Sequence, residues 1–321
     1  MQVEFRRLFL VENHEELYAR VAWAYYNEEL TQADIAKRMG MTRARVNRIL
    51  QECRETGLVQ IIINTDVAGC AGAEHGLERA FGLSKALVIP TPAKEKHLYT
   101  AIGKAAGAYL SSRIRDGQEL GLGWGTTLRA SGRALVQREP GGIRIVSLFG
   151  GLPTSSTTTP YDVASVFSRR LMAEECYYIA APMYVSCEAV RETLMSQQMF
   201  ANVFERAAKV DLAFVGSGDL TTRSTNFNHG AITDEEWTSL RDAGAVGELF
   251  GYFLDGVGEM VDHPLNRRFM GAELAKLKNI PTKIVASGGL HKVPIIRAGL
   301  SGGCIDVLVT DELTARALLD G

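Results

Sequence analysis

Two sets of side chains in this sequence could do chemistry, and the first is basic. A short segment holds five cationic side chains with no Asp or Glu among them: Lys37, Arg38, Arg43, Arg45 and Arg48. Residues 1–64 as a whole contain nine Lys/Arg and nine Asp/Glu, so the positive charge is focused on that segment. Clustered arginines on one helix suit phosphate neutralisation and base reading in DNA. A solvated helix face is the alternative.

The elements that must present these arginines are two short helices joined by a tight turn. Thr31 and Thr42 have the residue type that caps a helix start, and Gly40 can take the left-handed conformation that ends a helix. The second helix places a buried stripe at i, i+3, i+4 and i+7, formed by Val46, Ile49, Leu50 and Cys53. Residues 15–26 predict a third helix packed across the pair. The pattern is typical of a helix-turn-helix whose second helix enters the major groove.

The residues expected on DNA follow from that placement. We expect base contacts from the exposed side of the second helix: Arg43, Ala44, Asn47 and Arg48. We expect contacts nearer the DNA backbone from Gln32, Thr42 and Arg45.

The second set consists of glycine, hydroxyl and charged side chains after expected strands. The segment Gly123-Trp124-Gly125-Thr126-Thr127 follows a strand and opens a helix. Glycines allow close approach of the backbone, and exposed N–H groups with the helix dipole favour an anion. An ordinary strand-to-helix turn is the alternative. A dinucleotide site is disfavoured because the spacing is G-x-G-x-G.

Three similar loops follow other expected strands, at residues 149–152, 216–219 and 287–292. Four such loops on one sheet edge predict a crevice. Lys292 near a helix start has the wrong charge for the helix dipole, which makes sense if an anion lies there; a solvated lysine is the alternative. Glu248, among small residues, could hold sugar hydroxyls or lie at the surface.

These loops require a sheet to align them. From about residue 70 the sequence alternates short apolar strands with helices, which predicts a doubly wound α/β domain with a mostly parallel sheet. The expected strands are 86–89, 119–122, 143–148, 212–215, 283–286 and 306–309, and residues 59–63 predict one more in the N-terminal domain. The expected helices are 98–115, 127–137, 161–173, 199–208, 292–298 and 311–319. Small residues at 66–76 indicate a boundary, so we expect a DNA-binding domain over 1–64 and an effector and oligomerisation domain over 65–321.

Composition restricts the setting. The formal net charge of −2 over 321 residues excludes a generally basic protein, so any DNA contact must be local. The five cysteines are scattered, and we expect buried free thiols in a reducing cytoplasm. No signal-peptide pattern or membrane-spanning run is expected, and the six histidines show no metal-ligand spacing. We expect neither a cofactor nor a metal.

Several segments together resemble one family. The helix-turn-helix is followed by GLGWGTTL, then GAVGELFGYFLDGVG, then ASGGLHKVPIIRAGLSGGCIDVLVTDE. This arrangement resembles the SorC (SorC/DeoR) family of sugar-responsive bacterial transcription regulators. The resemblance implies an effector domain related to sugar-phosphate isomerases and glucosamine-phosphate deaminases. It also implies tetramers acting on palindromic operators, with a phosphorylated sugar or polyol as effector.

The resemblance also implies site residues. Gly125, Thr126, Thr127 and Lys292 would hold the phosphate, while Glu248 and the Gly218-Asp219 pair would face the sugar. The full set expected at the effector is Gly123, Gly125, Thr126, Thr127, Gly151, Gly218, Asp219, Glu248 and Lys292.

Features of the sequence bear on three possible functions. A ligand-controlled transcription regulator is favoured. A sugar-phosphate isomerase or deaminase is the main alternative, but the corresponding loop, residues 216–220, holds one acid where such isomerases carry several. An enzyme also has no need of residues 1–64. A constitutive structural DNA-binding protein leaves the glycine-loop crevice unexplained.

Overall fold

The computed structural model describes residues 15–59, 68–152, 159–221, 224 and 230–321. The chain divides into two compact units, Met1–Thr65 and Asp66–Gly321, and each is described by itself. Within the described residues no helix is both long and apolar enough to cross a membrane.

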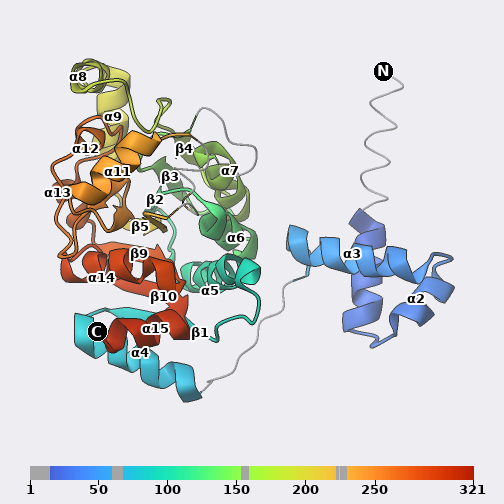
Figure 1. Ribbon diagram of the computed structural model, residues 1–321. Coiled ribbons are helices and arrows are strands. Elements are labelled where there is room, and N and C mark those ends of the chain that lie inside the picture. Colours follow the sequence, from blue (N-terminus) through green and yellow to red (C-terminus); the bar gives the residue numbers. More distant parts are fainter. Residues whose placement is uncertain (1–14, 60–67, 153–158, 222–223, 225–229) are drawn as a thin grey trace, which may run out of the picture. The chain divides into compact units, whose positions relative to one another are not determined.

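The part of the first unit that the structure describes, residues 15–59, contains three helices, over residues 15–26, α2 (Gln32–Arg38) and α3 (Arg43–Thr56) (Figure 1). Both predicted N-caps are confirmed, because the Thr31 hydroxyl accepts the Asp34 N–H and the Thr42 hydroxyl accepts the Arg45 N–H, each at 3.2 Å. Gly40 lies in the left-handed region with φ 63°. The turn therefore forms as the sequence predicts.

A small apolar core holds these three helices together. The predicted α3 stripe is confirmed, because all four of its members are buried: Val46, Ile49, Leu50 and Cys53. Val21 and Ala24 face the stripe from the first helix, and Ile35 and Ala36 face it from α2. The opposite side of α3 is thus left exposed. Most of the strand predicted over 59–63 lies outside the described residues.

A seven-stranded parallel sheet forms the centre of the second unit, in the order β1-β10-β9-β5-β2-β3-β4. The strands are β1 (Lys85–Ile89), β2 (Glu119–Leu122), β3 (Arg144–Ser147), β4 (Glu175–Tyr177), β5 (Leu212–Val215), β9 (Thr282–Ala286) and β10 (Val307–Asp311). The chain runs outward from β2 to β4, returns to β5, and then runs outward the other way. The order therefore reverses between β2 and β5, which is where ligands bind in open α/β sheets.

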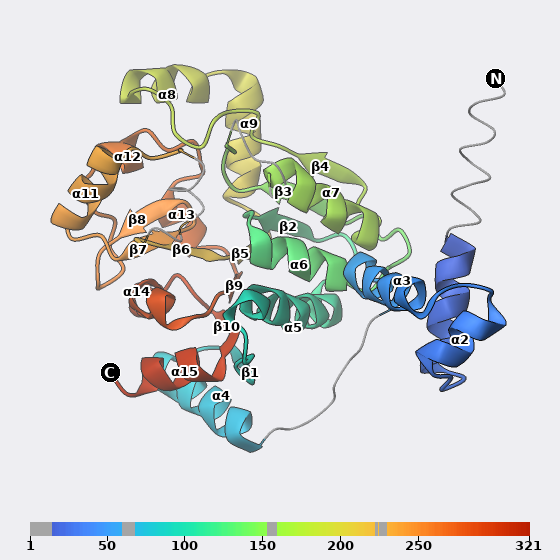
Figure 2. The same ribbon diagram turned by 45° about the vertical axis from the view of Figure 1, so that its right-hand side comes forward.

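Helices cover both faces of this sheet, as expected for a doubly wound fold (Figure 2). One face packs against α5 (Leu98–Arg113), α6 (Thr126–Ala134) and α7 (Pro160–Leu171). The other packs against α4 (Ala68–Phe81), α9 (Gln198–Ala207), α13 (Leu274–Lys278), α14 (Val293–Ser301) and α15 (Glu312–Leu319). The predicted α/β class is confirmed, and the six strands predicted for this unit lie within two residues of their observed bounds.

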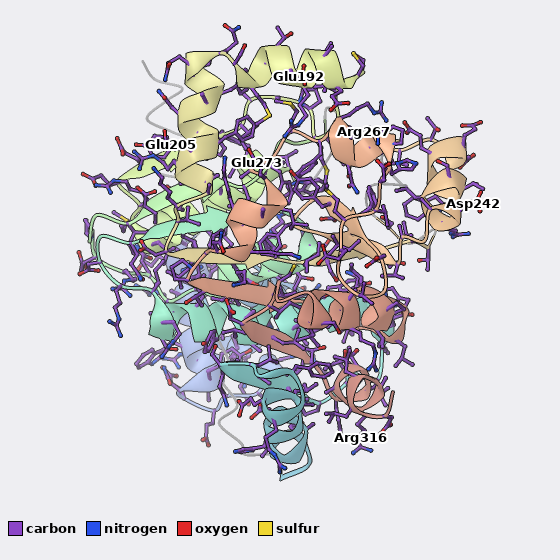
Figure 3. The ribbon with its side chains drawn as sticks, turned by 90° about the vertical axis from the view of Figure 1, so that its left-hand side faces the viewer. Glu192, Glu205, Asp242, Arg267, Glu273 and Arg316 are labelled. Atoms are coloured by element: carbon purple, nitrogen blue, oxygen red, sulfur yellow. The ribbon has the colours of Figure 1, made fainter. Side chains whose placement is uncertain are left out.

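A second, three-stranded antiparallel sheet was not predicted. It comprises β6 (Ser217–Asp219), β7 (Gly247–Leu249) and β8 (Tyr252–Leu254), in that order. Only Gly216 separates β5 from β6, so the small sheet grows directly from the carboxyl end of a central strand. Among the described residues of this unit, the other helical elements are η1 (Glu95–His97), α8 (Glu188–Met195), α11 (Asp234–Asp242), α12 (Pro264–Arg267) and η2 (Leu290–Lys292). Charged side chains such as Glu205 on α9 and Asp242 on α11 project outward from this unit (Figure 3).

The structure corrects two expectations from the sequence in part. The two units divide at Thr65 and Asp66, at the start of the expected boundary segment 66–76, but residues 68–76 of that segment belong to α4. Their small side chains let α4 pack closely on α15, since a Cβ at Gly76 would lie 3.0 Å from Leu319 Cδ1. The cysteines are all free, but Cys187 is exposed and Cys176 is half-buried.

Candidate functional site

The exposed side of α3 carries the side chains expected on DNA. Arg43, Ala44, Arg45, Asn47 and Arg48 are all exposed. At 100° per residue, Ala44 and Arg48 lie opposite the buried stripe. Asn47 lies between Ala44 and the edge of the stripe. This face can enter a groove without disturbing the core behind it.

Residues at the starts of α2 and α3 lie on a common side of the first unit. Gln32 and Arg43 line one hollow, together with Tyr25 and Thr31. Arg48 forms an ion pair with Glu52, with Nε 2.8 Å from Oε1. Such an exposed pair contributes little to stability, so the guanidinium can exchange this partner for DNA.

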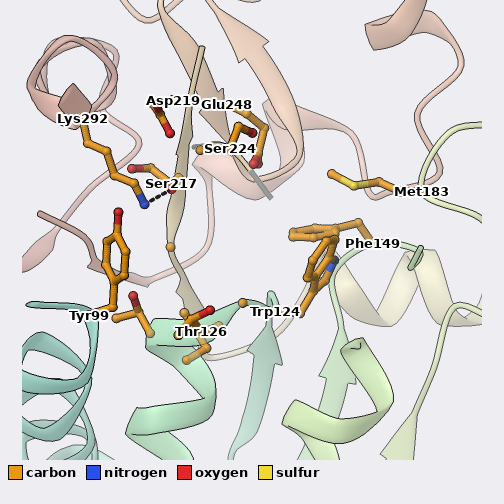
Figure 4. A pocket seen from close by; sticks show the side chains of 15 residues that line it. Tyr99, Trp124, Thr126, Phe149, Met183, Ser217, Asp219, Ser224, Glu248 and Lys292 are labelled. Atoms are coloured by element: carbon orange, nitrogen blue, oxygen red, sulfur yellow. Dashed lines mark hydrogen bonds between the residues drawn. The ribbon is translucent and has the colours of Figure 1, made fainter. Parts of the chain in front are cut away.

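The second site is a cavity in the larger unit, at the carboxyl ends of β2, β5 and β9. It has a volume of about 110 Å³. A water-sized sphere fills roughly 10–15 Å³ on this measure, so the cavity accommodates a small organic molecule. Its lining comes from segments that are far apart in the sequence (Figure 4). The lining residues are Tyr99, Trp124, Gly125, Thr126, Thr127, Leu128, Phe149, Met183, Gly216, Ser217, Gly218, Asp219, Ser224, Glu248 and Lys292.

Helix α6 presents its N-terminus to this cavity. Gly125 is the N-cap with φ 133° and ψ 172°, a conformation that favours glycine, and it provides no side-chain cap. The first N–H groups of the helix therefore need acceptors from elsewhere. Thr126 and Thr127 add two hydroxyl groups beside them. Together with the positive end of the helix dipole, these donors form a local environment for an anion.

Lys292 brings a positive charge to the same cavity. It is the last residue of η2, and its Nζ donates to the carbonyl oxygen of Ser217 at 2.7 Å. The ammonium also lies 5.0 Å from the centre of the Tyr99 ring, in cation–π geometry. Tyr99 is in turn placed by its hydroxyl, 3.1 Å from His291 Nε2. The charge is thus fixed in position rather than solvated, contrary to the simpler alternative for this lysine.

The small sheet supplies two carboxyl groups. Glu248 on β7 pairs in register with Gly218 on β6, and a Cβ at Gly218 would lie 3.0 Å from Glu248 Oε2. Glycine at that position therefore leaves room for the carboxylate. Asp219 at the end of β6 is buried and accepts hydrogen bonds from the N–H and hydroxyl of Thr221. The 2.7 Å contact between the Ser217 and Ser287 hydroxyls links β6 to the loop after β9.

Burial changes the acid–base behaviour of two of these groups. It raises the pKa of Glu248 to about 7, while the Gly251 N–H that binds its Oε1 and the charge of Lys292 act in the opposite direction. Burial lowers the pKa of Lys292, and Asp219 and Glu248 partly offset that effect. A half-buried carboxyl and a half-buried ammonium with shifted pKa values in one cavity are typical of a binding site.

The structure brings most of the expected effector residues together, but it does not bring Gly123 and Gly151 to the cavity lining. The Gly123 N–H is bonded to the Phe214 carbonyl at 3.0 Å within the sheet. Gly151 instead forms a bridge with Pro182. Both glycines therefore shape the loops behind the cavity.

Sequence reasoning missed the aromatic and apolar part of the lining. Tyr99 and Met183 come from two separate segments that no local pattern marks, whereas Phe149 belongs to the predicted loop 149–152 but was not assigned to the ligand. Trp124, set between two glycines of the first loop, was the one signal available, because a large aromatic residue in such a loop suits an apolar wall. One side of the cavity is thus apolar and the other is polar (Figure 4).

Comparison with known proteins covers nearly all of the chain. Residues 65–320 match the Sugar-bind family model, which describes a sugar-binding domain, and residues 17–64 match the MarR family model. The transcriptional regulator LsrR of Enterobacter sp. (strain 638) is 34% identical over 325 residues, covering 98% of this chain and 96% of that protein. LsrR of Escherichia coli (strain K12) is 33% identical over 313 residues, covering 95% of each.

Solved structures of regulators have the same architecture. The full-length sorbitol operon regulator SorC from Klebsiella pneumoniae superposes with a TM-score of 0.72 at 27% identity, covering 96% of this chain and 99% of that one. A DeoR family transcriptional regulator from Listeria monocytogenes gives 0.70 at 27% identity, covering 78% and 99%. These similar proteins are named as regulators, which supports a regulatory role over the enzymatic alternative.

Proposed function

The chain belongs to the SorC/DeoR-type family of sugar-binding transcriptional regulators, and on that premise we propose that its effector is a phosphorylated sugar or polyol bound in the cavity at β2, β5 and β9. The observation that carries the proposal is the meeting of the uncapped α6 N-terminus with Lys292 in one small cavity. A dianionic phosphate satisfies both through hydrogen bonds and charge.

The phosphate end of the ligand is assigned to α6 and Lys292. The N–H groups after Gly125 and the hydroxyls of Thr126 and Thr127 donate to its oxygens, as at other helix N-termini that bind phosphate. Lys292 exchanges its bond to the Ser217 carbonyl for a charged hydrogen bond to the ligand. Charge-assisted hydrogen bonds of this kind are among the strongest available in a protein.

The polyol end is assigned to the small sheet. Glu248, Asp219 and Gly218 offer oxygen acceptors for hydroxyl groups. Trp124 and Phe149 form the apolar side, against which the C–H face of a sugar can pack. The ligand therefore lies with its charged end on α6 and its hydroxyls on β6 and β7.

Operator recognition is assigned to residues 1–64, and effector binding and oligomerisation to residues 65–321. Base reading falls to Arg43, Ala44, Asn47 and Arg48, with Gln32, Thr42 and Arg45 nearer the backbone. One recognition helix reads only a few base pairs, so the protein acts as a symmetric oligomer on two or more half-sites. Following the family resemblance, we assign it as a tetramer that acts in the cytoplasm. Sedimentation of the free protein and of its operator complex tests this, and a monomer on a single half-site contradicts it.

A matched ligand screen tests the effector. Sugars and polyols are compared with their phosphate esters by thermal shift, because a ligand that binds the native state raises the melting temperature. We expect at least one phosphate ester to stabilise the protein more than its neutral parent. Calorimetry on that pair then measures the difference, and equal affinity for the two forms would exclude an anion site.

A further inference from the structure

The cavity contains more negative than positive side chains. Asp219 and Glu248 contribute two carboxyl groups, and Lys292 contributes the one ammonium group among the described lining residues. With all three ionised, the lining carries a net side-chain charge of −1, the sum of two negative charges and one positive. An anionic ligand entering this cavity is opposed by its own binding site, because charges in a poorly solvated space interact strongly.

Glu248 is the carboxyl group placed to relieve that opposition. The titratable groups that act on it are Lys292 from η2 and the Tyr184 phenol from the segment between β4 and α8. Asp219 from β6 lines the same cavity, but it is paired with Gly247, so its side chain lies on the other face of the small sheet. Lys292 directs its ammonium at the Ser217 carbonyl. Asp219, by contrast, accepts two hydrogen bonds from Thr221, which occupy its Oδ2.

The near-neutral titration of Glu248 agrees with this geometry. Its Oε1 accepts the Gly251 N–H, whereas its Oε2 lies against Gly218, where no side chain screens it. Burial raises the pKa of this carboxyl to about 7. A nearby anion disfavours the carboxylate further. A proton can therefore be held at Glu248 once the ligand is present.

We propose that the effector enters this cavity together with one proton, which the Glu248 carboxylate takes up from water to become a carboxylic acid. An O–H bond forms on Glu248 as the bond to the same proton breaks in a hydronium ion or a buffer acid of the solvent. No group is oxidised or reduced, and the side-chain charge of the lining rises from −1 to zero. The new O–H donates a hydrogen bond to an oxygen of the ligand. This inference rests on the proposed function, since it requires an anion in the cavity.

Proton uptake makes anion affinity depend on pH in a defined direction. Below about pH 7 Glu248 is already protonated in the free protein, so the dissociation constant stays level. Above that value each binding event must take a proton from solvent, and the dissociation constant rises by up to about tenfold per pH unit. Effector response is then strongest in a mildly acidic cell and weakest in an alkaline one.

Inorganic sulfate is the probe that isolates this effect, because it stays dianionic throughout the range whereas a phosphate ester titrates near pH 6. Equilibrium dialysis with radiolabelled sulfate, at constant ionic strength from about pH 6 to about pH 9, compares the full-length protein with Glu248→Gln. We expect the parent to lose affinity above about pH 7. We expect Glu248→Gln to keep a level affinity and to bind more tightly than the parent at the alkaline end.

Glu205→Gln is the matched control, because Glu205 is exposed on the outer side of α9 and pairs with Lys209 (Figure 3). It should follow the parent at every pH. A pH dependence that persists in Glu248→Gln would assign the effect to Lys292 and overturn the inference. A Glu248→Gln protein weaker than the parent at every pH would also overturn it, since Glu248 would then act as an ionised acceptor. If neither the parent nor Lys292→Ala binds sulfate, the proposed anion site itself would be overturned.

Discussion

The side chains assigned to DNA lie within residues 32–48, whereas Tyr99 and Lys292, which meet in the effector cavity, lie 193 positions apart. The DNA surface consists of exposed side chains on a helix that a small local core holds in place. The cavity consists of groups from helices, loops and the small sheet, and burial changes the pKa of both Glu248 and Lys292. Residues of the DNA surface can thus be substituted one at a time without disturbing the fold. The geometry of the cavity depends instead on how distant segments of the chain pack together.

The largest effect is expected from removing two arginines of the local surface. Arg43→Ala with Arg48→Ala should weaken operator binding by roughly 2–6 kcal/mol, because each base-contacting arginine contributes about 1–3 kcal/mol and separated contacts add approximately. Footprinting on DNA selected with the parent protein measures the loss. Effector binding should not change. A double variant that footprints like the parent would show that α3 is not the recognition helix.

Lys292→Ala should have the opposite pattern: effector binding should weaken and operator binding should not change. A charged hydrogen bond contributes about 1.5–3 kcal/mol, so affinity for the phosphorylated effector should fall by roughly one to two decades. Calorimetry gives the value, and ligand-free operator binding should stay unaltered because Lys292 belongs to the second unit. Lys276→Ala, an exposed lysine paired with Glu273, is the control and should bind effector normally. If the two variants bind the effector with equal affinity, Lys292 does not contact the ligand.

Glu248→Gln should change how the free energy of unfolding depends on pH. The folded-state pKa of Glu248 is raised from 4.5 to about 7, so the folded protein holds the proton longer than the unfolded chain. Parent stability therefore falls as pH rises from about 4.5 to about 7 and is level above. The glutamine variant should lack that fall and exceed the parent by about 1–2 kcal/mol above pH 7, after allowance for solvent screening. Urea unfolding at several pH values checks this, and identical pH profiles for variant and parent would contradict it.

The smallest effect is expected at the N-cap of the recognition helix. Thr42→Ala removes the hydroxyl that accepts the Arg45 N–H and should destabilise the first unit by about 1 kcal/mol. Thr42→Ser keeps an oxygen there and should restore most of that loss. Thermal unfolding followed in both variants decides it. A Thr42→Ser protein as unstable as Thr42→Ala would mean that the cap contributes nothing.

The same contrast explains which parts of the structure could be predicted. Both caps, the Gly40 turn and the Val46 stripe depend on neighbours within a few residues, so the sequence pattern sufficed. The parallel strands were also predictable, because apolar runs alternate with helices. The small sheet was missed because its strands are three residues long and carry glycine and acidic residues as well as apolar ones.

The cavity was predicted in part for a related reason. Loops after strands share one sheet edge, which correctly brought Gly125, Asp219 and Lys292 together. Their contacts could not be foreseen, because the Lys292–Ser217 bond joins residues 75 positions apart. The register that places Glu248 opposite Gly218 likewise depends on the whole domain. Helix α4 was missed because its glycines and alanines, which serve close packing on α15, also fit the small-residue composition expected at a domain boundary.

The central claim is that an anion bound in this cavity controls operator binding. The most direct test measures the protein's operator affinity in the presence of a sugar phosphate and of its neutral sugar. A fluorescent operator bound by the parent protein and by Lys292→Ala is titrated with a sugar phosphate selected by the screen and with its neutral parent sugar. We expect the phosphate ester to change the parent protein's operator affinity at concentrations where the neutral sugar does nothing, and we expect Lys292→Ala to need roughly 10- to 100-fold more of the ester. An operator response that is the same for both ligands, or for both proteins, would contradict control by an anion at this cavity.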